Sequence, residues 1–303
     1  MHATMHAGMQ TNTPSAAQIS ERLYNVAHGR EQMYVLLDRH TEHPLQEEVA
    51  ALADAANVGL PLLDVLFKDN PTQSPLLLCL QRSRVEHAAV LERSIELALE
   101  QALEPNASRS VCAWLVSDVP PYALQRELTQ RLDAHWPGGQ RMYFRYFDPR
   151  VMPRLMQVLS PAEQAQLFGP VHTWCQLGRN GQWLALVPSP REPDTPALIG
   201  RMRLNESTAQ AVDRIELVNL TLAALRRHAS MPDQAQDMQI DRAVQAAHTQ
   251  GTTTPEDTVA YAWRAVLYGN AFTAHPALQA LLTQARNAEL PLESLLQEKI
   301  QLA

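Results

Sequence analysis

The sequence predicts an α/β domain, with a central mixed sheet flanked by helices, followed by an all-α helical domain. In the first half of the chain, short apolar runs alternate with segments of helical periodicity, which is typical of layered α/β domains. Several runs, such as 75–80 (PLLLCL), are apolar almost without interruption, as expected for strands covered on both faces of a sheet. From residue 205 onward the pattern is helical throughout. The order of the strands does not follow from the sequence.

The elements of the first domain can be predicted in chain order. Helices are expected at 19–27, 45–56, 85–103 and 120–136, and strands or strand-like apolar runs at 32–39, 60–67, 75–80, 111–116 and 142–147. The helix over 85–103 has the clearest pattern, because its small and apolar residues recur at helical spacing while its charged residues lie outside that stripe. The stripe consists of Ala88, Leu91, Ile95, Ala98 and Ala102.

The composition and the hydrophobic pattern of the chain change after Trp183. The stretch 187–200 (VPSPREPDTPALIG) contains four prolines and is typical of a linker or a long extended connection. Beyond it, helices are expected at 211–229, 255–268, 276–286 and 291–300, the second with Thr254 as its cap and Gly269 at its end. The predicted organisation is a disordered leader (1–18), an α/β domain (19–190), a proline-rich linker (191–204) and a helical domain (205–303).

Composition and charge narrow the class of protein. Of the 303 residues, 46% are apolar and 19% are charged, which is typical of a folded globular chain. The formal charge of −7 and the lack of a basic block argue against binding to nucleic acid. No apolar run is long enough to insert into a membrane, and the leader does not resemble a signal peptide. The three cysteines lie far apart, which favours a reduced, cytoplasmic protein.

The stretch 142–152 (MYFRYFDPRVM) is the most distinctive in the sequence. Alternation along a strand predicts that Met142, Phe144 and Tyr146 face one way and that Tyr143, Arg145 and Phe147 face the other. Asp148 and Pro149 then have the residue types of a helix N-cap and of the first helical position. Further on, Ser160 and Glu163 predict a capping box, and Gly169 with Pro170 predicts a helix end.

Arg145 and Arg150 need partners for their charged donors. An arginine among aromatic residues pairs with a carboxylate or stacks on a ring, and Asp148 is the nearest carboxylate in sequence. A buried arginine–aspartate link would lock the corner, whereas an exposed one would form a charged patch rimmed by aromatic residues. Arginine and tyrosine dominate protein–protein hot spots. Both interpretations remain open from the sequence.

These residues resemble the signature of the Tap/TEC family, the effector chaperones (adaptors) of the bacterial type VI secretion system. The resemblance rests on Arg145, Tyr146, Phe147, Asp148, Pro149 and Arg150, on Phe168, Gly169 and Pro170, and on an early strand at 34–38. It extends over about 33–187 and departs from the family at Ser74-Pro75, where a Gly-Pro is common. The resemblance implies a non-catalytic protein without a cofactor, which binds a toxic effector in the cytoplasm and delivers it to the VgrG spike.

The helix over 255–268 offers a second candidate surface. Tyr261, Arg264 and Tyr268 share one helical face, which could line a groove facing a partner. Because the helix is apolar nearly all round, it could equally be a core helix, and for Trp263 the core is the favoured interpretation.

Other chemistry has weaker support in the sequence. Asp38, His40, Glu42 and His43 are residue types that bind metals, but they lie in a predicted loop without a second cluster, and we expect no metal site. Cys112 lies in an apolar strand and is expected to be buried rather than nucleophilic. No catalytic motif occurs, so no catalytic residue is predicted. The alternatives are an enzyme that binds an anionic substrate at Arg145, Asp148 and Arg150, and an interaction module of another system.

Overall fold

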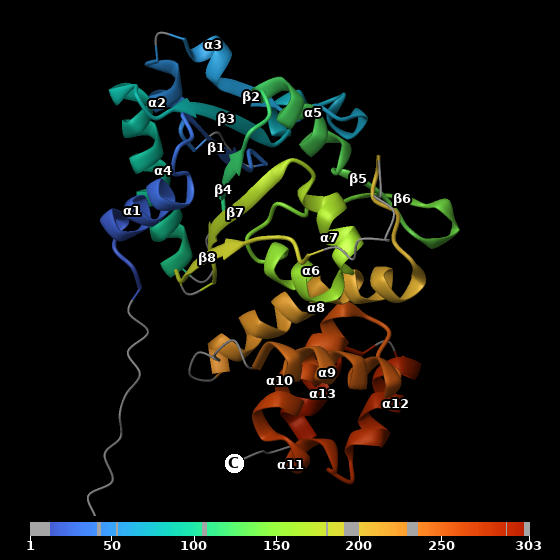
Figure 1. The fold of residues 1–303 in the computed structure, drawn as a ribbon. Coiled ribbons are helices and arrows are strands. Elements are labelled where there is room, and N and C mark those ends of the chain that lie inside the picture. Colours follow the sequence, from blue (N-terminus) through green and yellow to red (C-terminus); the bar gives the residue numbers. More distant parts are fainter. Residues whose placement is uncertain are drawn as a thin grey trace, which may run out of the picture. The chain divides into compact units, whose positions relative to one another are not determined.

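A computed structural model describes residues 13–40, 44–52, 54–104, 108–179, 181–190, 200–228, 236–288 and 290–299. The chain divides into two compact units, residues 1–205 (unit 1) and 206–303 (unit 2) (Figure 1). Unit 1 is built around a sheet with helices, and unit 2 is helical, so the predicted α/β and all-α fold classes are confirmed. No helix in the described part of the chain has both the length and the apolar character needed to cross a membrane.

The main sheet of unit 1 has six strands in the order β2-β3-β1-β4-β7-β8. They are β1 (Gln32–Leu37), β2 (Gly59–Pro61), β3 (Leu76–Gln81), β4 (Val111–Ser117), β7 (Val171–Leu177) and β8 (Trp183–Leu186). Each pair of neighbours in this sheet is antiparallel, where a mixture of directions was expected. A mixture of parallel and antiparallel strands was expected because helices connect successive strands, as they do between parallel strands. The helix between β3 and β4 does join two strands of the same direction, but β1 lies between them and runs the opposite way.

Helices and 3₁₀ turns complete unit 1. The helices are α1 (Ala16–Val26), α2 (Gln46–Ala50), α3 (Ala55–Val58), α4 (Val85–Leu103), α5 (Pro121–Gln130), α6 (Met152–Val158) and α7 (Pro161–Phe168). The 3₁₀ turns are η1 (Val65–Phe67), η2 (Pro71–Gln73) and η3 (Pro137–Gly139). Figure 1 shows α1 and α4 on one side of the main sheet and α6 and α7 on the other. The apolar side chains of α1 and α4 share a buried core with Val35 and Trp114 of the sheet, which explains why this face of the strands is apolar.

Several predicted boundaries were wrong, each because of a specific contact. Helix α1 begins at Ala16, three residues before the predicted start, because Ser15 and Gln18 form a capping box. The helix expected over 45–56 is split into α2 and α3, and Asp54, between them, pairs with Arg84 and His87. The run at 60–67 is a strand only to Pro61, because Asp64 then caps η1. Residues 1–12 and 191–199, in the predicted leader and linker, lie outside the described residues.

A second, smaller sheet was missed by the sequence analysis. The helix expected over 120–136 ends at Gln130, and β5 (Asp133–His135) follows it and pairs antiparallel with β6 (Arg141–Tyr143). Residues 132–136 (LDAHW) continue a helical pattern, but pairing with β6 on one side and with residues 202–204 on the other fixes Asp133–His135 as a strand. Strands β7 and β8 also had no counterpart in the predicted set.

Unit 2 contains α8 (Glu206–His228), α9 (Gln236–Thr249), α10 (Pro255–Tyr268), α11 (Asn270–Thr273), α12 (Leu278–Ala288) and α13 (Leu292–Lys299). Helix α10 lies at its centre and contributes to two buried apolar clusters, one with α8 and α9 and one with α12 and α13. Its predicted ends are confirmed: the Thr254 hydroxyl accepts a hydrogen bond from the Asp257 N–H, and Gly269 follows the last turn with a φ of 52°.

Candidate functional site

The corner after β6 is a turn rather than a longer strand. Strand β6 ends at Tyr143, and the backbone turns at Arg145–Asp148, where the Asp148 N–H donates to the Arg145 carbonyl. The Asp148 carboxylate accepts a hydrogen bond from the Arg150 N–H at 2.9 Å, and this side-chain turn leads into α6. Helix α6 begins only at Met152. The predicted roles of Asp148 as N-cap and Pro149 as first helical residue are therefore wrong, because the side-chain turn precedes the helix.

The aromatic residues of the corner are buried together. Phe144, Tyr146 and Phe147 are at most 3% exposed, so the alternation predicted for a strand does not hold beyond Tyr143. Tyr146 packs edge-on against Phe147 and Trp174, with ring centroids 5.7 and 5.9 Å away. Its hydroxyl donates to the Leu128 carbonyl at 2.9 Å. Since Trp174 lies on β7, the aromatic residues attach the corner to the main sheet.

Four charged side chains meet at the surface of this corner and form what we call the corner ion cluster: Asp38, Arg145, Asp148 and Arg150. Arg150 binds Asp148 through two nitrogens, at 2.9 and 2.7 Å. Arg145 donates to Asp38 at 2.6 Å and lies 3.6 Å from Asp148. Asp38 follows β1, so the cluster joins the end of a central strand to the corner.

The electrostatics of the cluster favour its charged form. Burial by itself would raise the pKa of Asp148, but the hydrogen bonds and charge of Arg150 and the charge of Arg145 hold it below the usual range of an aspartic acid. The hydrogen bonds to Asp148 in turn raise the pKa of the Arg150 guanidinium. Beneath the cluster, burial raises the pKa of the Cys112 thiol well above its ordinary value, consistent with an inert buried side chain.

The cluster has the geometric features of both interpretations that the sequence left open: buried carboxylates and exposed arginines. The side chains of Asp38 and Asp148 are 12% and 7% exposed, so the carboxylates hold the corner from inside. The side chains of Arg145 and Arg150 are 40% and 41% exposed and reach the surface. Two arginines and two aspartates cancel in charge, so a free anion would have to compete with a carboxylate at either arginine. This arrangement suits a braced recognition surface better than an anion-binding site.

The second half of the motif folds as predicted. Ser160 and Glu163 form a capping box at the start of α7, and Gly169 ends that helix with a φ of 53°. A side chain at Gly169 would overlap the guanidinium of Arg131, whose Nε donates to the Gln166 carbonyl at 2.8 Å. The Pro170 carbonyl accepts a hydrogen bond from the Ser117 hydroxyl at 2.8 Å. These contacts attach the end of α7 to β4.

The surface predicted on α10 is not exposed. Tyr261 and Arg264 are 3% and 6% exposed, and Tyr268 is half-buried against the apolar core of unit 2. Arg264 binds Glu293 of α13 through two hydrogen bonds of 2.7 Å and lies over the Trp263 ring at 4.2 Å. The expectation of a partner-facing groove at Tyr261, Arg264 and Tyr268 is corrected because these contacts turn the side chains into unit 2. Trp263 is 6% exposed, as the core interpretation expected.

The metal-ligand candidates do not gather into a site among the described residues. Glu42 and His43 lie outside the described residues. Asp38 binds Arg145 and accepts a hydrogen bond from the His40 N–H at 3.0 Å, so it orders the following turn, as predicted. Elsewhere in the described ranges, no group of three or more histidine, cysteine or acidic residues is placed to hold a metal ion.

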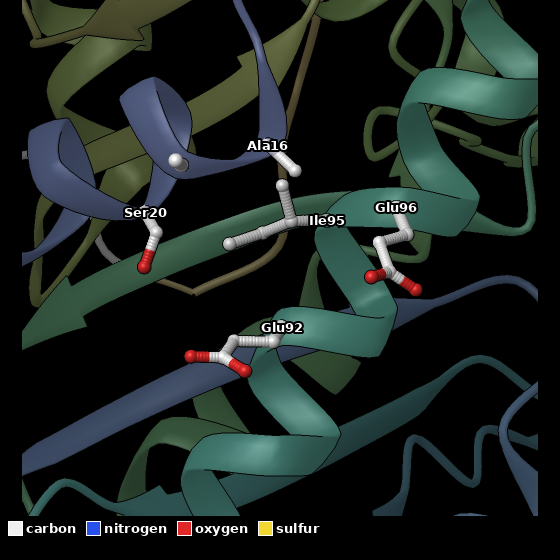
Figure 2. Close-up of a pocket in the computed structure, with 6 residues that line it drawn as sticks. Ala16, Ser20, Glu92, Ile95 and Glu96 are labelled. Carbon is white, nitrogen blue, oxygen red and sulfur yellow. The ribbon is translucent and has the colours of Figure 1, made fainter.

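A pocket of about 350 Å³ lies between α1 and α4, away from the motif residues. Figure 2 shows its lining, with Ala16 and Ser20 on α1 and Glu92, Ile95 and Glu96 on α4. The rim is acidic, and the apolar lining comes from small side chains and Ile95. The pocket contains no nucleophile-and-base pair of the kind that catalysis requires, and we assign it no role.

Two elements of the site were missed from the sequence. Asp38 was predicted to order a turn, but its pairing with Arg145, 107 residues away, could be found only from the fold. The strand β5 gave no signal of its own. Arg141 on β6 pairs with Asp133 on β5, and this opposite-charge pair could have suggested the hairpin.

Comparison with protein families supports a coarse assignment. Residues 33–166 match the family model described as "Domain of unknown function (DUF4123)". The match includes the whole corner ion cluster and ends just before Phe168, Gly169 and Pro170. No curated protein and no solved structure matches the chain. Residues 33–166 are therefore similar to this domain family, and they lie within the α/β unit that precedes the helical unit.

Proposed function

We propose that this chain is a non-catalytic adaptor of a type VI secretion system, which binds an effector toxin in the cytoplasm and loads it onto the VgrG spike. The matched domain family is associated with type VI effector adaptors, and the chain resembles that family through the corner motif. The observation that carries the proposal is the corner ion cluster. Its four charged groups satisfy one another, and it presents two half-exposed arginines on a rigid aromatic base.

An adaptor needs surfaces that bind its partner proteins specifically and can later release them. A specific interface buries on the order of 800 Å² on each partner, with a polar rim and a few anchoring side chains. Arg145 and Arg150 suit the anchoring role, because arginine is enriched at hot spots and both side chains are already held in place by carboxylates. We propose these two arginines as partner-binding residues. The buried residues of α10 are not part of this proposal.

The enzyme alternative receives no support from the geometry. An anionic substrate at Arg145 and Arg150 would have to displace Asp38 or Asp148, both of which bind an arginine at 2.7 Å or less. The one nearby thiol, Cys112, is buried and held in its protonated form. The adaptor function therefore explains the cluster with fewer assumptions.

Co-expression tests the proposal directly. The full chain would be expressed with the toxin encoded beside its gene and with the spike protein of the same cluster, and complexes would be purified through a tag on the chain. We expect the toxin to co-purify, and the double variant Arg145→Ala/Arg150→Ala to lose most of it. Arg93→Ala is the matched control, because Arg93 is also about 40% exposed and paired with carboxylates, but lies on α4. Failure of the unmodified chain to bind either protein would refute the proposal.

A further inference from the structure

The small sheet of unit 1 ends in an open edge at β6. Strand β5 lies between β6 and residues 202–204, since the His135 N–H donates to the Met202 carbonyl and the Leu204 N–H donates to the His135 carbonyl. Strand β6 pairs with β5 alone among the described residues. Its three residues are exposed, which contrasts with the buried strands at the centre of the main sheet.

The hydrogen-bond pattern of the β5–β6 hairpin shows which backbone groups of β6 point away from β5. The Phe144 N–H donates to the Leu132 carbonyl, and the Trp136 N–H donates to the Gln140 carbonyl, both at 2.8 Å. Bonded and non-bonded pairs alternate along an antiparallel ladder, so Met142 directs its backbone groups toward β5. Arg141 and Tyr143 therefore direct their N–H and C=O groups outward.

These outward groups match the backbone of an extended chain. Within the described residues, the backbone groups of Arg141 and Tyr143 have no hydrogen-bond partner. They lie two residues apart, which corresponds to about 7 Å along a strand. Charged side chains and proline commonly protect a free edge from pairing; this edge has no proline, and its one charged residue, Arg141, is paired with Asp133. The edge can therefore accept another strand.

Exposed apolar side chains lie beside the edge. The segment around η1 runs past β6, because Asp64 interacts with the charge of Arg141 and the Phe67 ring packs edge-on against Tyr143 at 5.4 Å. We call five exposed residues of β6, η1 and the segment just before η1 the edge patch: Leu63, Val65, Leu66, Met142 and Tyr143, which are 52%, 60%, 49%, 37% and 38% exposed. Scattered apolar residues are common on surfaces, but a group next to a free strand edge marks a binding surface.

The charges around the edge determine what it fits. Arg141 and Arg201 both pair with the buried carboxylate of Asp133, and Arg141 also interacts with the charge of Asp64, so two cations near the edge are balanced by two carboxylates. A charged strand would gain little here, and its charge would lie against the edge patch. The surface is thus complementary to a segment that is uncharged and apolar at alternate positions.

We infer that β6 binds an extended, apolar, uncharged segment of the effector by adding it as a further strand beside Arg141 and Tyr143. The identification of the partner as the effector rests on the proposed adaptor function. The open edge and the edge patch are features of the structure and do not depend on that proposal. A three-residue edge is far too short to supply the roughly 800 Å² that a stable interface needs from each partner. A second copy paired through this edge alone would therefore dissociate. The bound segment belongs to a larger protein with further contacts, to which the corner ion cluster can contribute.

A pair of variants at Tyr143 isolates the backbone hydrogen bond. Tyr143→Ala removes the ring but keeps the N–H, whereas Tyr143→Pro removes both, and proline is tolerated on edge strands. We expect Tyr143→Pro to weaken effector binding about two- to tenfold more than Tyr143→Ala, as for one lost hydrogen bond. Circular dichroism and thermal unfolding of both variants check the fold. Equal binding by the two variants would overturn the inference while leaving the adaptor function intact.

Hydrogen exchange tests the same edge without any substitution. In the free chain, the amides of Arg141 and Tyr143 should exchange rapidly, and in the purified complex with the effector they should become protected. This measurement decides the question if Tyr143→Pro does not fold. Unchanged exchange in a formed complex would refute strand addition. If the unmodified chain binds no effector at all, the proposed function fails, and the assignment of this partner fails with it.

The edge patch has its own control. Val65→Asp places a charge in the patch and should weaken effector binding about tenfold, because the charge would have to be desolvated against an apolar segment. Val85→Asp is the matched variant, since Val85 is 82% exposed but lies at the start of α4. Equal effects of the two substitutions would contradict a role for the patch. Concentration-dependent dimerisation that Val65→Asp abolishes would instead assign the edge to a second copy and overturn the inference.

Discussion

Two ion pairs of this protein are built in opposite ways. At the corner of unit 1 the carboxylate of Asp148 is buried, with a side chain 7% exposed, and its partner Arg150 is 41% exposed. In unit 2 the guanidinium of Arg264 is buried, with a side chain 7% exposed, and its partner Glu293 is 40% exposed. Both Arg150 and Arg264 were candidate binding residues from the sequence. Only the corner exposes its cations to solvent.

The aromatic neighbours explain the difference. Arg264 lies over the Trp263 ring at 4.2 Å and also donates to the Ala260 carbonyl one turn earlier, so its charged plane is covered within unit 2. Arg145 lies 5.9 Å from the Phe147 ring, while Phe147 itself is buried beneath the corner. The residue types on their own therefore do not reveal which end of an ion pair reaches the surface.

The largest expected effect follows from removing the buried acid of the corner. Asp148→Ala takes away the partner of Arg150, the acceptor of the Arg150 N–H and one counter-charge of Arg145. We expect the free energy of unfolding to fall by about 2–3 kcal/mol, less than for a fully buried pair because the arginines are partly solvated. Denaturant unfolding measures it. Asp148→Asn can keep the hydrogen bond from the Arg150 N–H and should lose less unfolding free energy than Asp148→Ala. Equal losses in the two variants would show that only the charge of Asp148 matters.

The corresponding change in unit 2 should be smaller and should be repairable. Glu293→Ala leaves the buried Arg264 without a counter-charge, and we expect a loss of about 1–2 kcal/mol, discounted because Glu293 is substantially exposed. In the double variant Arg264→Met/Glu293→Ala, an apolar chain of similar length fills the site, so most of the loss should be recovered. Neither variant should change effector binding. A binding defect in a fully folded Glu293→Ala protein would break the contrast between the two pairs.

Among the features that the sequence predicted correctly are capping contacts between neighbouring residues, and among those that it missed are pairs between distant residues. The capping box of Ser160 and Glu163 and the cap of α10 at Thr254 were found because each involves residues three positions apart. The Asp38–Arg145 pair joins residues 107 positions apart, and no local pattern contains that information. For the same reason the burial of Arg264 was missed, since it depends on Glu293 in another helix.

A smaller effect compares two buried tyrosines. The Tyr146 hydroxyl donates to the Leu128 carbonyl, so Tyr146→Phe leaves a buried acceptor without this partner, and we expect a loss of about 1 kcal/mol. Tyr261 is also buried, but within the described residues its hydroxyl has no hydrogen bond, so Tyr261→Phe should be nearly neutral. Thermal unfolding of the two variants measures the difference. If Tyr261→Phe lost more stability than Tyr146→Phe, the hydrogen bond of Tyr146 would not be stabilising the corner.

Lowering the pH should affect the stability contributions of the two ion pairs differently, and this difference should be smallest at neutral pH. Burial raises the pKa of Asp148, but the hydrogen bonds and charges of Arg150 and Arg145 together hold it below its ordinary value, and the hydrogen bonds from Arg264 lower the pKa of Glu293. A depressed carboxyl pKa gives stability that is present above the unfolded-state pKa, about 4, and is lost as pH falls through the folded-state pKa. Asp148→Asn and Glu293→Gln should each flatten this acid dependence of the unfolding free energy. Because Asp148 is buried and Glu293 is screened by solvent, 0.5 M salt should reduce the effect at Glu293 more, and an equal response would show that the two carboxylates share one environment.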